Sequence, residues 1–167
     1  MPSPRTACNK QNEVALVNRR HLWFWLLLTG SAIAATLFFS AQDAQASGSL
    51  SLSLLVRIVR RFPFLRKLGN VSFLHHLLRK AAHFTLYFVL GCGLRGLCSY
   101  QERAPAHWVT LGTGTLYACL DEFHQTFSAG RAPALRDVGI DALGVMTGCA
   151  FVSLCFFLTR RGGVRRP

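Results

Sequence analysis

Acidic residues are scarce in this chain: seven Asp and Glu stand against nineteen Lys and Arg among 167 residues, which gives a formal net charge of +12. Charged residues make up only 16% of the chain, against about 25% in a typical soluble protein. Hydrophobic residues make up 51%, and the mean hydropathy is +0.30. This balance excludes a disordered chain and argues against a water-soluble globular protein.

The cysteine spacings that mark zinc sites or disulfide frameworks are also lacking. The six cysteines form no CxxC pair and no Cys/His spacing, and we interpret them as small packing residues. The cations flank long apolar runs and do not form a basic stripe, so nucleic acid is not a predicted partner. We predict no cofactor and no metal.

The long apolar runs indicate an integral membrane protein. The first run contains LWFWLLLTGSAIAATLFF without a charge, close to the roughly twenty residues that cross a bilayer. We therefore predict an all-α integral membrane bundle of four transmembrane helices, over residues 22–40, 81–98, 106–127 and 137–158. An alternative for the first run is a secretory signal, because Arg19 and Arg20 precede it and Ala44-Gln45-Ala46 resembles a cleavage site.

Basic residues also bear on orientation. Four spans place the basic leader 1–21 and the basic tail 159–167 on one side, which then carries ten Lys and Arg against nine on the other. Arg19 and Arg20 abut the first span, and charges near a span end have the largest influence. We predict that both termini are cytoplasmic.

The predicted external loop, residues 41–80, contains an amphipathic stretch at 50–62. Ser53, Arg57, Arg60 and Arg61 share one arc of a helical wheel, and apolar residues fill the remainder. This pattern is typical of a helix in the headgroup layer, with its arginines near anionic lipid phosphates. A soluble helix packed on a partner has the same periodicity.

Polar residues recur at helical spacing near the external ends of three predicted spans, where ionisable groups usually face a bundle interior or a functional cavity. The stripes are His76, Lys80, His83 and Tyr87; Tyr117, Asp121, His124 and Gln125; and Asp137, Asp141, Gly144 and Gly148. We predict that these stripes converge on one polar site. Gly144 and Gly148 form a small-residue face that permits close helix packing.

Several chemistries suit this set. Arg79, Lys80, Arg131 and Arg136 can hold a phosphate or carboxylate. Asp121, Glu122 or Asp137 can act as a general base. The histidines and acids can bind a divalent metal, although no HExxH or similar ligand spacing supports it. Alternatively, the charged groups only link helices and set their register.

Two blocks of sequence resemble the VanZ-like family of small bacterial membrane proteins: RKAAHFTLYFVLG at residues 79–91 and DEFHQTFSAGRAPALRDVGIDALGVMTG at residues 121–148. The resemblance extends from the first predicted span to the last. The matching motif positions are Lys80, His83, Tyr87, Asp121, Glu122, Gln125, Gly130, Arg131, Asp137, Asp141, Gly144 and Gly148. Two positions differ from the family pattern. Asp141 stands where many members have Asn, and Ala129 stands where members often have proline before the Gly-Arg pair.

The family takes its name from a glycopeptide-resistance determinant linked to teicoplanin susceptibility. The resemblance therefore implies a multi-pass protein of the bacterial cytoplasmic (inner) membrane, in contact with anionic lipids. We predict that it binds or modifies an anionic envelope component, a lipid-linked phosphate or a peptidoglycan precursor. The predicted ligand-binding residues are Lys80, His83, Tyr87, Asp121, Glu122, Gln125, Arg131, Asp137 and Asp141. In this prediction Lys80 and Arg131 hold the anion, whereas Asp121, Glu122 and His83 set protonation and orientation.

Two alternatives belong to other classes of function. The first is a membrane-embedded hydrolase or transferase that acts on a lipid headgroup, for which the sequence assigns no catalytic residue. The second is a structural helix bundle that assists another membrane protein.

Overall fold

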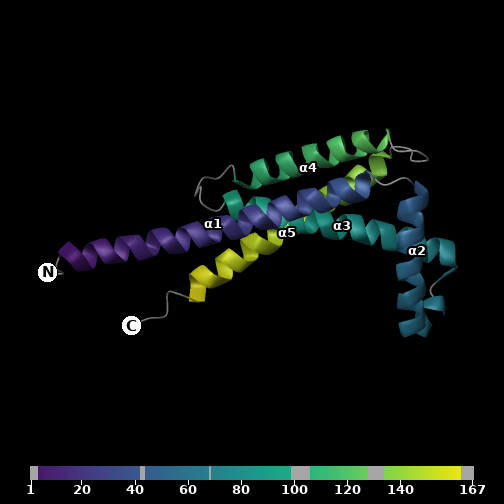
Figure 1. Cartoon of the computed structure of the whole chain (residues 1–167), viewed down its shortest axis with the longest axis horizontal. Coiled ribbons are helices and arrows are strands. Elements are labelled where there is room, and N and C mark those ends of the chain that lie inside the picture. Colours follow the sequence, from purple (N-terminus) through teal and green to yellow (C-terminus); the bar gives the residue numbers. More distant parts are fainter. Residues whose placement is uncertain (1–3, 42–43, 68, 99–105, 128–133, 163–167) are drawn as a thin grey trace.

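The computed structural model describes residues 4–41, 44–67, 69–98, 106–127 and 134–162. Every secondary-structure element in this part of the chain is a helix, which confirms the predicted all-α class (Figure 1). The elements are α1 (Pro4–Ser40), α2 (Ala44–Arg61), the short 3-10 helix η1 (Pro63–Lys67), α3 (Val71–Cys98), α4 (Ala106–Gln125) and α5 (Leu135–Gly162).

Three helices are long and apolar enough to cross a membrane, over Arg19–Ser40, Val71–Cys98 and Leu135–Thr159. The chain is therefore a multi-pass membrane protein. The predicted span at 106–127 corresponds to α4, which is not among the candidate spans found in the described residues. Carboxylates and amides near the end of α4, at Asp121, Glu122 and Gln125, lower its mean hydropathy.

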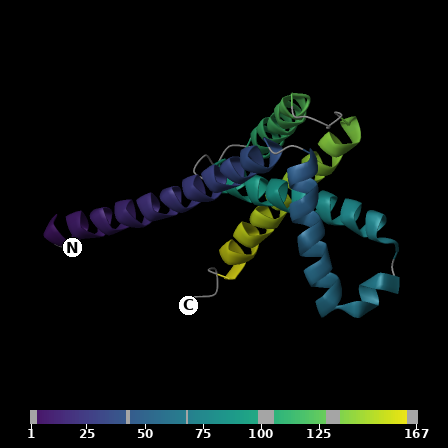
Figure 2. The ribbon, with the colours of Figure 1, turned by 45° about the vertical axis from the view of Figure 1, so that its right-hand side comes forward.

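The four long helices α1, α3, α4 and α5 form one bundle (Figures 1 and 2). The chain passes from the N-terminal side of the bundle through α1, returns in α3, passes again in α4 and returns in α5 (Figure 1). The ends of α1 and α4 and the starts of α3 and α5 consequently meet at the end of the bundle remote from both termini. The hydrophobic core takes residues from all four helices: Ala32, Tyr87, Leu90, Ala118 and Val145.

Helices α3 and α5 make the most extensive contact in the bundle, and glycines allow it. A Cβ atom on Gly144 would lie 2.7 Å from the Phe84 carbonyl oxygen, and one on Gly148 would overlap the Phe88 carbonyl oxygen. The contact is equally close on the side of α3, because a Cβ on Gly91 would overlap the Val145 backbone of α5. The two backbones therefore pack directly on one another, as small residues permit in membrane helices.

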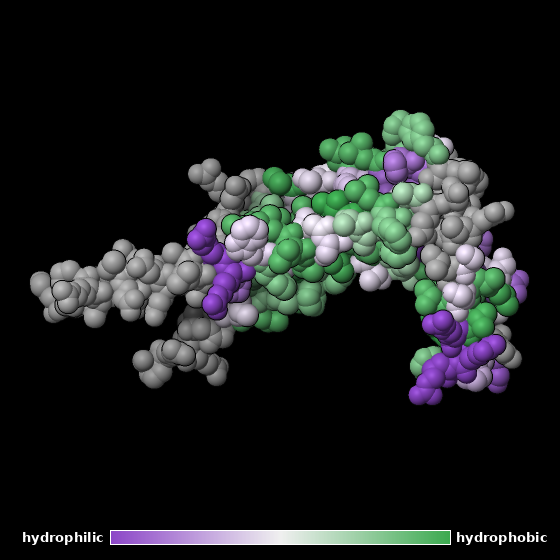
Figure 3. All heavy atoms as spheres, in the orientation of Figure 1, coloured by the Kyte–Doolittle hydropathy of each residue, from purple (hydrophilic) through white to green (hydrophobic). Residues whose placement is uncertain are grey.

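Large apolar side chains cover the outer surface of the bundle. Trp108 is 76% exposed and Leu27 is 70% exposed. Soluble proteins rarely expose wide, contiguous apolar patches to water. The space-filling view shows apolar residues over the middle of the bundle and hydrophilic residues toward its two ends (Figure 3). This distribution suits a hydrocarbon environment around the middle of the bundle.

Helix boundaries differ from the predicted ones where polar segments extend an apolar helix. Helix α3 begins at Val71 and not at residue 81, because the Asn70 side chain accepts a hydrogen bond from the Phe73 amide (2.8 Å) and caps the helix. Helix α1 likewise includes most of the predicted leader, and α5 includes residues on both sides of 137–158.

The amphipathic helix predicted at 50–62 is also longer than expected. Helix α2 begins at Ala44 and ends at Arg61, before Pro63, which has no amide hydrogen to continue a helix. It runs across the bundle axis beside the start of α3 (Figure 1). A hydrogen bond of 2.7 Å between Ser51 Oγ and His75 Nε2 joins the two helices.

Candidate functional site

A pocket of about 630 Å³ lies where α3 and α5 begin and α4 ends. Ligand pockets in proteins commonly measure about 300–1,000 Å³, so a small molecule or a lipid headgroup fits it. Its lining residues come from α3, from the end of α4 and from the start of α5: Phe73, His76, Leu77, Arg79, Lys80, His83, Glu122, Gln125, Ala134, Arg136, Asp137, Ile140 and Asp141.

The outer part of the pocket is basic. Lys80 donates a hydrogen bond to Asp137 Oδ1 and forms an ion pair with it, and both side chains are more than one third exposed. Arg79 and Arg136 also line the pocket, and neither forms an ion pair with any residue in the described part of the chain. The pocket thus offers two guanidinium groups that a ligand anion can engage.

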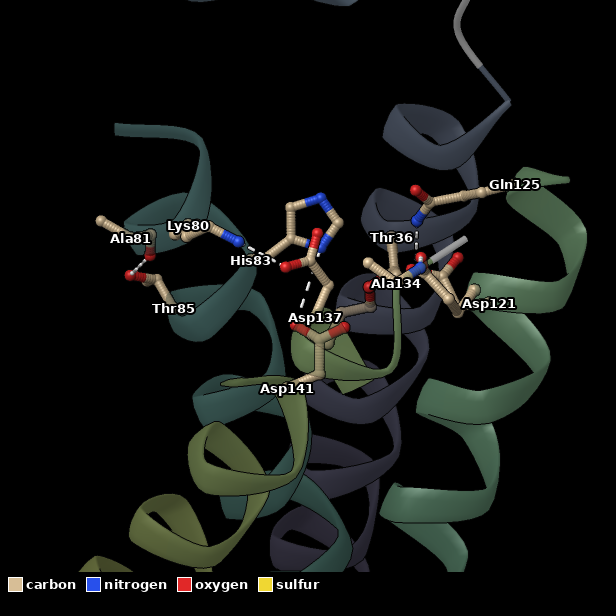
Figure 4. Close-up of polar contacts among 12 residues, drawn as sticks. Thr36, Lys80, Ala81, His83, Thr85, Asp121, Gln125, Ala134, Asp137 and Asp141 are labelled. Atoms are coloured by element: carbon tan, nitrogen blue, oxygen red, sulfur yellow. Dashed lines mark hydrogen bonds and ion pairs between the residues drawn. The ribbon is translucent and has the colours of Figure 1, made fainter. Parts of the chain in front are cut away.

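The inner part of the site is acidic. His83 Nδ1 lies 3.6 Å from Asp141 Oδ1, and the side chain of Asp141 is only 1% exposed. Asp121, which is 2% exposed, accepts a hydrogen bond from Gln125 Nε2 at 3.1 Å. Figure 4 shows these groups approaching one another from α3, α5 and α4. One potential ligand atom from each of His83, Asp121 and Asp141 lies within 4.8 Å of the others.

Several buried oxygens in this region have no hydrogen-bond partner within the described part of the chain. They are both carboxylate oxygens of Asp141, Oδ1 of Asp121 and the hydroxyl of Tyr87. Buried polar groups in native proteins are nearly always hydrogen-bonded, and a buried, uncompensated charge costs several kcal/mol. Each of these oxygens can therefore accept a hydrogen bond without giving up one already formed among the described residues.

Glu122 has a different surrounding from its neighbour Asp121. Its Oε1 accepts a hydrogen bond of 2.6 Å from the Ala134 amide, directly before α5. Glu122 thus ties the end of α4 to the start of α5 and holds in place the helix turn that presents Asp137. Glu122, which the sequence predicts to set protonation in the site, therefore also has a structural role.

The structure brings together most of the predicted ligand-binding residues. Those that line the pocket or contact its lining residues are Lys80, His83, Asp121, Glu122, Gln125, Asp137 and Asp141. Tyr87 lies deeper and is fully buried in the core. Arg131, like Gly130, lies outside the described residues.

The other members of the polar stripes have separate positions. His76 lines the pocket as an exposed side chain, whereas His124 is exposed and lies outside the pocket lining. Tyr117 donates a hydrogen bond of 3.3 Å to the Ile33 carbonyl oxygen and so joins α4 to α1. Gly144 and Gly148 face α3 at the close contact described above.

Apolar residues of the pocket were not part of the sequence prediction. Phe73, Leu77 and Ile140 are among its lining residues, and Phe73 and Leu77 are more than half exposed. The sequence pattern predicts a loop over residues 41–80, whereas in the structure the first turns of α3 begin at Val71. Asn70, a favoured N-cap residue, followed by helix-compatible residues was the signal that could have found them.

Comparison with known proteins identifies a family for this chain. No curated protein and no solved structure matches the chain. The VanZ/LLP1 family matches over residues 22–157, a range that includes every residue that lines the pocket. This match confirms the resemblance found in the motifs, and the chain, with its apolar spanning helices and polar pocket, belongs to the VanZ/LLP1 family of membrane proteins.

Proposed function

We propose that this VanZ-family protein binds an anionic, lipid-linked envelope component in the pocket at the outer end of its bundle. The observation that carries the proposal is the composition of the pocket: the cations Arg79, Lys80 and Arg136 lie beside the apolar side chains of Phe73 and Leu77. An amphiphile with a phosphate head and a hydrocarbon chain matches both parts.

The charges support a phosphate in particular. Guanidinium groups bind phosphate with two parallel hydrogen bonds, and Arg79 and Arg136 have no ion-pair partner among the described residues. Lys80 is paired with Asp137 but partly exposed, so it can turn toward a bound anion. Arg131, predicted from the motif, is a further proposed contact.

The apolar residues support a lipid. Phe73 is 55% exposed and Leu77 is 53% exposed, on the first turns of a helix that is long enough to span a membrane. A hydrocarbon chain that leaves the pocket over these residues stays in contact with apolar surface. A soluble anion of the same charge gains nothing from that contact.

Chain connectivity supports four spans and a common side for the termini. Helices α3 and α5 both run from the pocket end toward the terminal end (Figure 1). If both cross the bilayer, the segment between them must cross it in the opposite direction, and α4 is the helix in that position. Its 20 residues extend about 30 Å, the thickness of the hydrocarbon core. With cytoplasmic termini, the pocket faces the outside of the cell membrane.

Binding of a polyprenyl phosphate to the full chain in lipid nanodiscs tests the proposal, with the uncharged polyprenol as the ligand control. We expect Lys80→Ala and Arg136→Ala each to raise Kd about tenfold or more, because a charge-assisted hydrogen bond contributes about 1.5–3 kcal/mol. Arg60→Ala, an exposed arginine of α2 outside the pocket, should leave Kd unchanged. Equal Kd values for all three variants, or equally tight binding of the alcohol, would contradict the proposal.

A further inference from the structure

We propose that His83, Asp121 and Asp141 form a binding site for a divalent cation beside the lipid pocket. The three residues come from α3, α4 and α5 and are far apart in the sequence, so only the bundle brings them together (Figure 4). This inference does not depend on the proposed lipid ligand, because the protein side chains alone would hold the ion.

The geometry is close to that of a coordination shell. Metal–ligand distances of about 2.0–2.2 Å place neighbouring ligand atoms about 3.4 Å apart. His83 Nδ1 and Asp141 Oδ1 are already separated by 3.6 Å, and all three ligand atoms lie within 4.8 Å of one another. Side-chain rotations that move the atoms by about one ångström would complete the shell.

The unpartnered oxygens point to a missing cation. Both oxygens of Asp141 and Oδ1 of Asp121 are buried and have no hydrogen-bond partner among the described residues. The two residues are only 1% and 2% exposed. Lys80, which lines the same pocket as Asp141, is paired with Asp137 one helical turn before Asp141. Two buried carboxylates thus face a single imidazole, and a divalent ion would compensate their charge.

The ligand types indicate which ions fit. One imidazole nitrogen with carboxylate oxygens is suited to Mn²⁺, Zn²⁺ or Fe²⁺ more than to Mg²⁺ or Ca²⁺, which prefer oxygen ligands alone. Three protein ligands leave coordination positions free, as in metal sites that bind water or substrate. His83 and Asp141 line the pocket, so those free positions would face the proposed phosphate.

Mn²⁺ titration of the full, tag-free chain tests the site, because Mn²⁺ has little affinity for the chain's free cysteines. After treatment with EDTA, we expect the chain to bind one Mn²⁺ ion saturably. The loss of the electron-spin resonance signal of free Mn²⁺ measures this binding. His83→Gln and Asp141→Asn should weaken binding about a hundredfold or more, since even outer-shell partners of a metal contribute about 10–100-fold.

His124→Gln is the matched control, because this exposed histidine lies on α4 one turn after Asp121 but is outside both the pocket lining and the cluster. It should bind Mn²⁺ as the unaltered chain does. Equal affinities for His83→Gln, Asp141→Asn and the unaltered chain would overturn the proposal.

A measurement on the unaltered chain avoids any dependence on variant folding. Co²⁺ added to the EDTA-treated protein should give visible absorption bands from nitrogen and oxygen ligands, and Mn²⁺ should raise the melting temperature through preferential binding to the folded state. If neither the absorption bands nor the rise in Tm is observed, the three side chains only link the helices, and no metal site exists.

Discussion

Replacing Gly148 with alanine tests the close contact between α3 and α5 that places the pocket residues. A Cβ at this position would overlap the Phe88 carbonyl oxygen and lie 2.9 Å from the Cys92 amide nitrogen. Both atoms belong to the backbone, so no side-chain rotation can make room and the helices must separate.

The magnitude follows from two opposing effects. Overpacking a tight contact costs about 1–3 kcal/mol, and the upper part of this range applies because the backbone must move. Alanine gains about 1 kcal/mol of helix propensity over glycine. We therefore expect Gly148→Ala to lower the free energy of unfolding by about 1–2 kcal/mol, which corresponds to a fall in Tm of about 2–8 °C for a chain of this size.

Thermal unfolding in detergent, followed by circular dichroism, measures this change. Gly139→Ala on the same helix is the control, since a Cβ there meets nothing within 4 Å and should leave Tm unchanged or raise it. A Tm for Gly148→Ala equal to that of the unaltered chain, or an equal fall for Gly139→Ala, would refute the direct backbone contact.

Two further predictions concern the α4–α5 connection and the topology. Glu122→Ala removes the acceptor for the Ala134 amide and should lower the free energy of unfolding by about 1–2 kcal/mol, or Tm by about 2–8 °C. Glu122→Gln retains an acceptor oxygen and should lower Tm less. Equal Tm values for the two variants and the unaltered chain would contradict this role. In a cysteine-free background, a membrane-impermeant maleimide should label Thr126→Cys, exposed at the pocket end, in intact cells, whereas Arg161→Cys should require permeabilised cells; the reverse pattern would invert the proposed orientation.

Much of the fold could be predicted from local sequence. The helical class and the spans at the first, second and last apolar runs follow from runs long enough for a bilayer, and the structure confirms them. The extension of α3 back to Val71 was missed, because it depends on the Asn70 cap and on packing against α2, and not on hydropathy.

The candidate site divides in a similar way. Helical spacing alone placed Lys80 and His83 on one face of α3, and Asp137 and Asp141 on one face of α5. Spacing also put His124 in the same set as Asp121, yet His124 is exposed and outside the pocket. One arc of a helical wheel includes more residues than the helix face that contacts its neighbours. The wheel therefore cannot distinguish a residue that faces the bundle from an adjacent residue that faces outward.

Composition and periodicity by themselves determined that this chain is a helical membrane protein with polar faces on three helices, because each of those properties resides within a single segment. Spatial packing alone decided which oxygens of Asp121 and Asp141 are buried without partners among the described residues. It also decided which pocket cations form no ion pair with those residues. The physical reason is that burial and pairing depend on atoms from different helices, and their separation is set by backbone contacts such as that of Gly148 with α3.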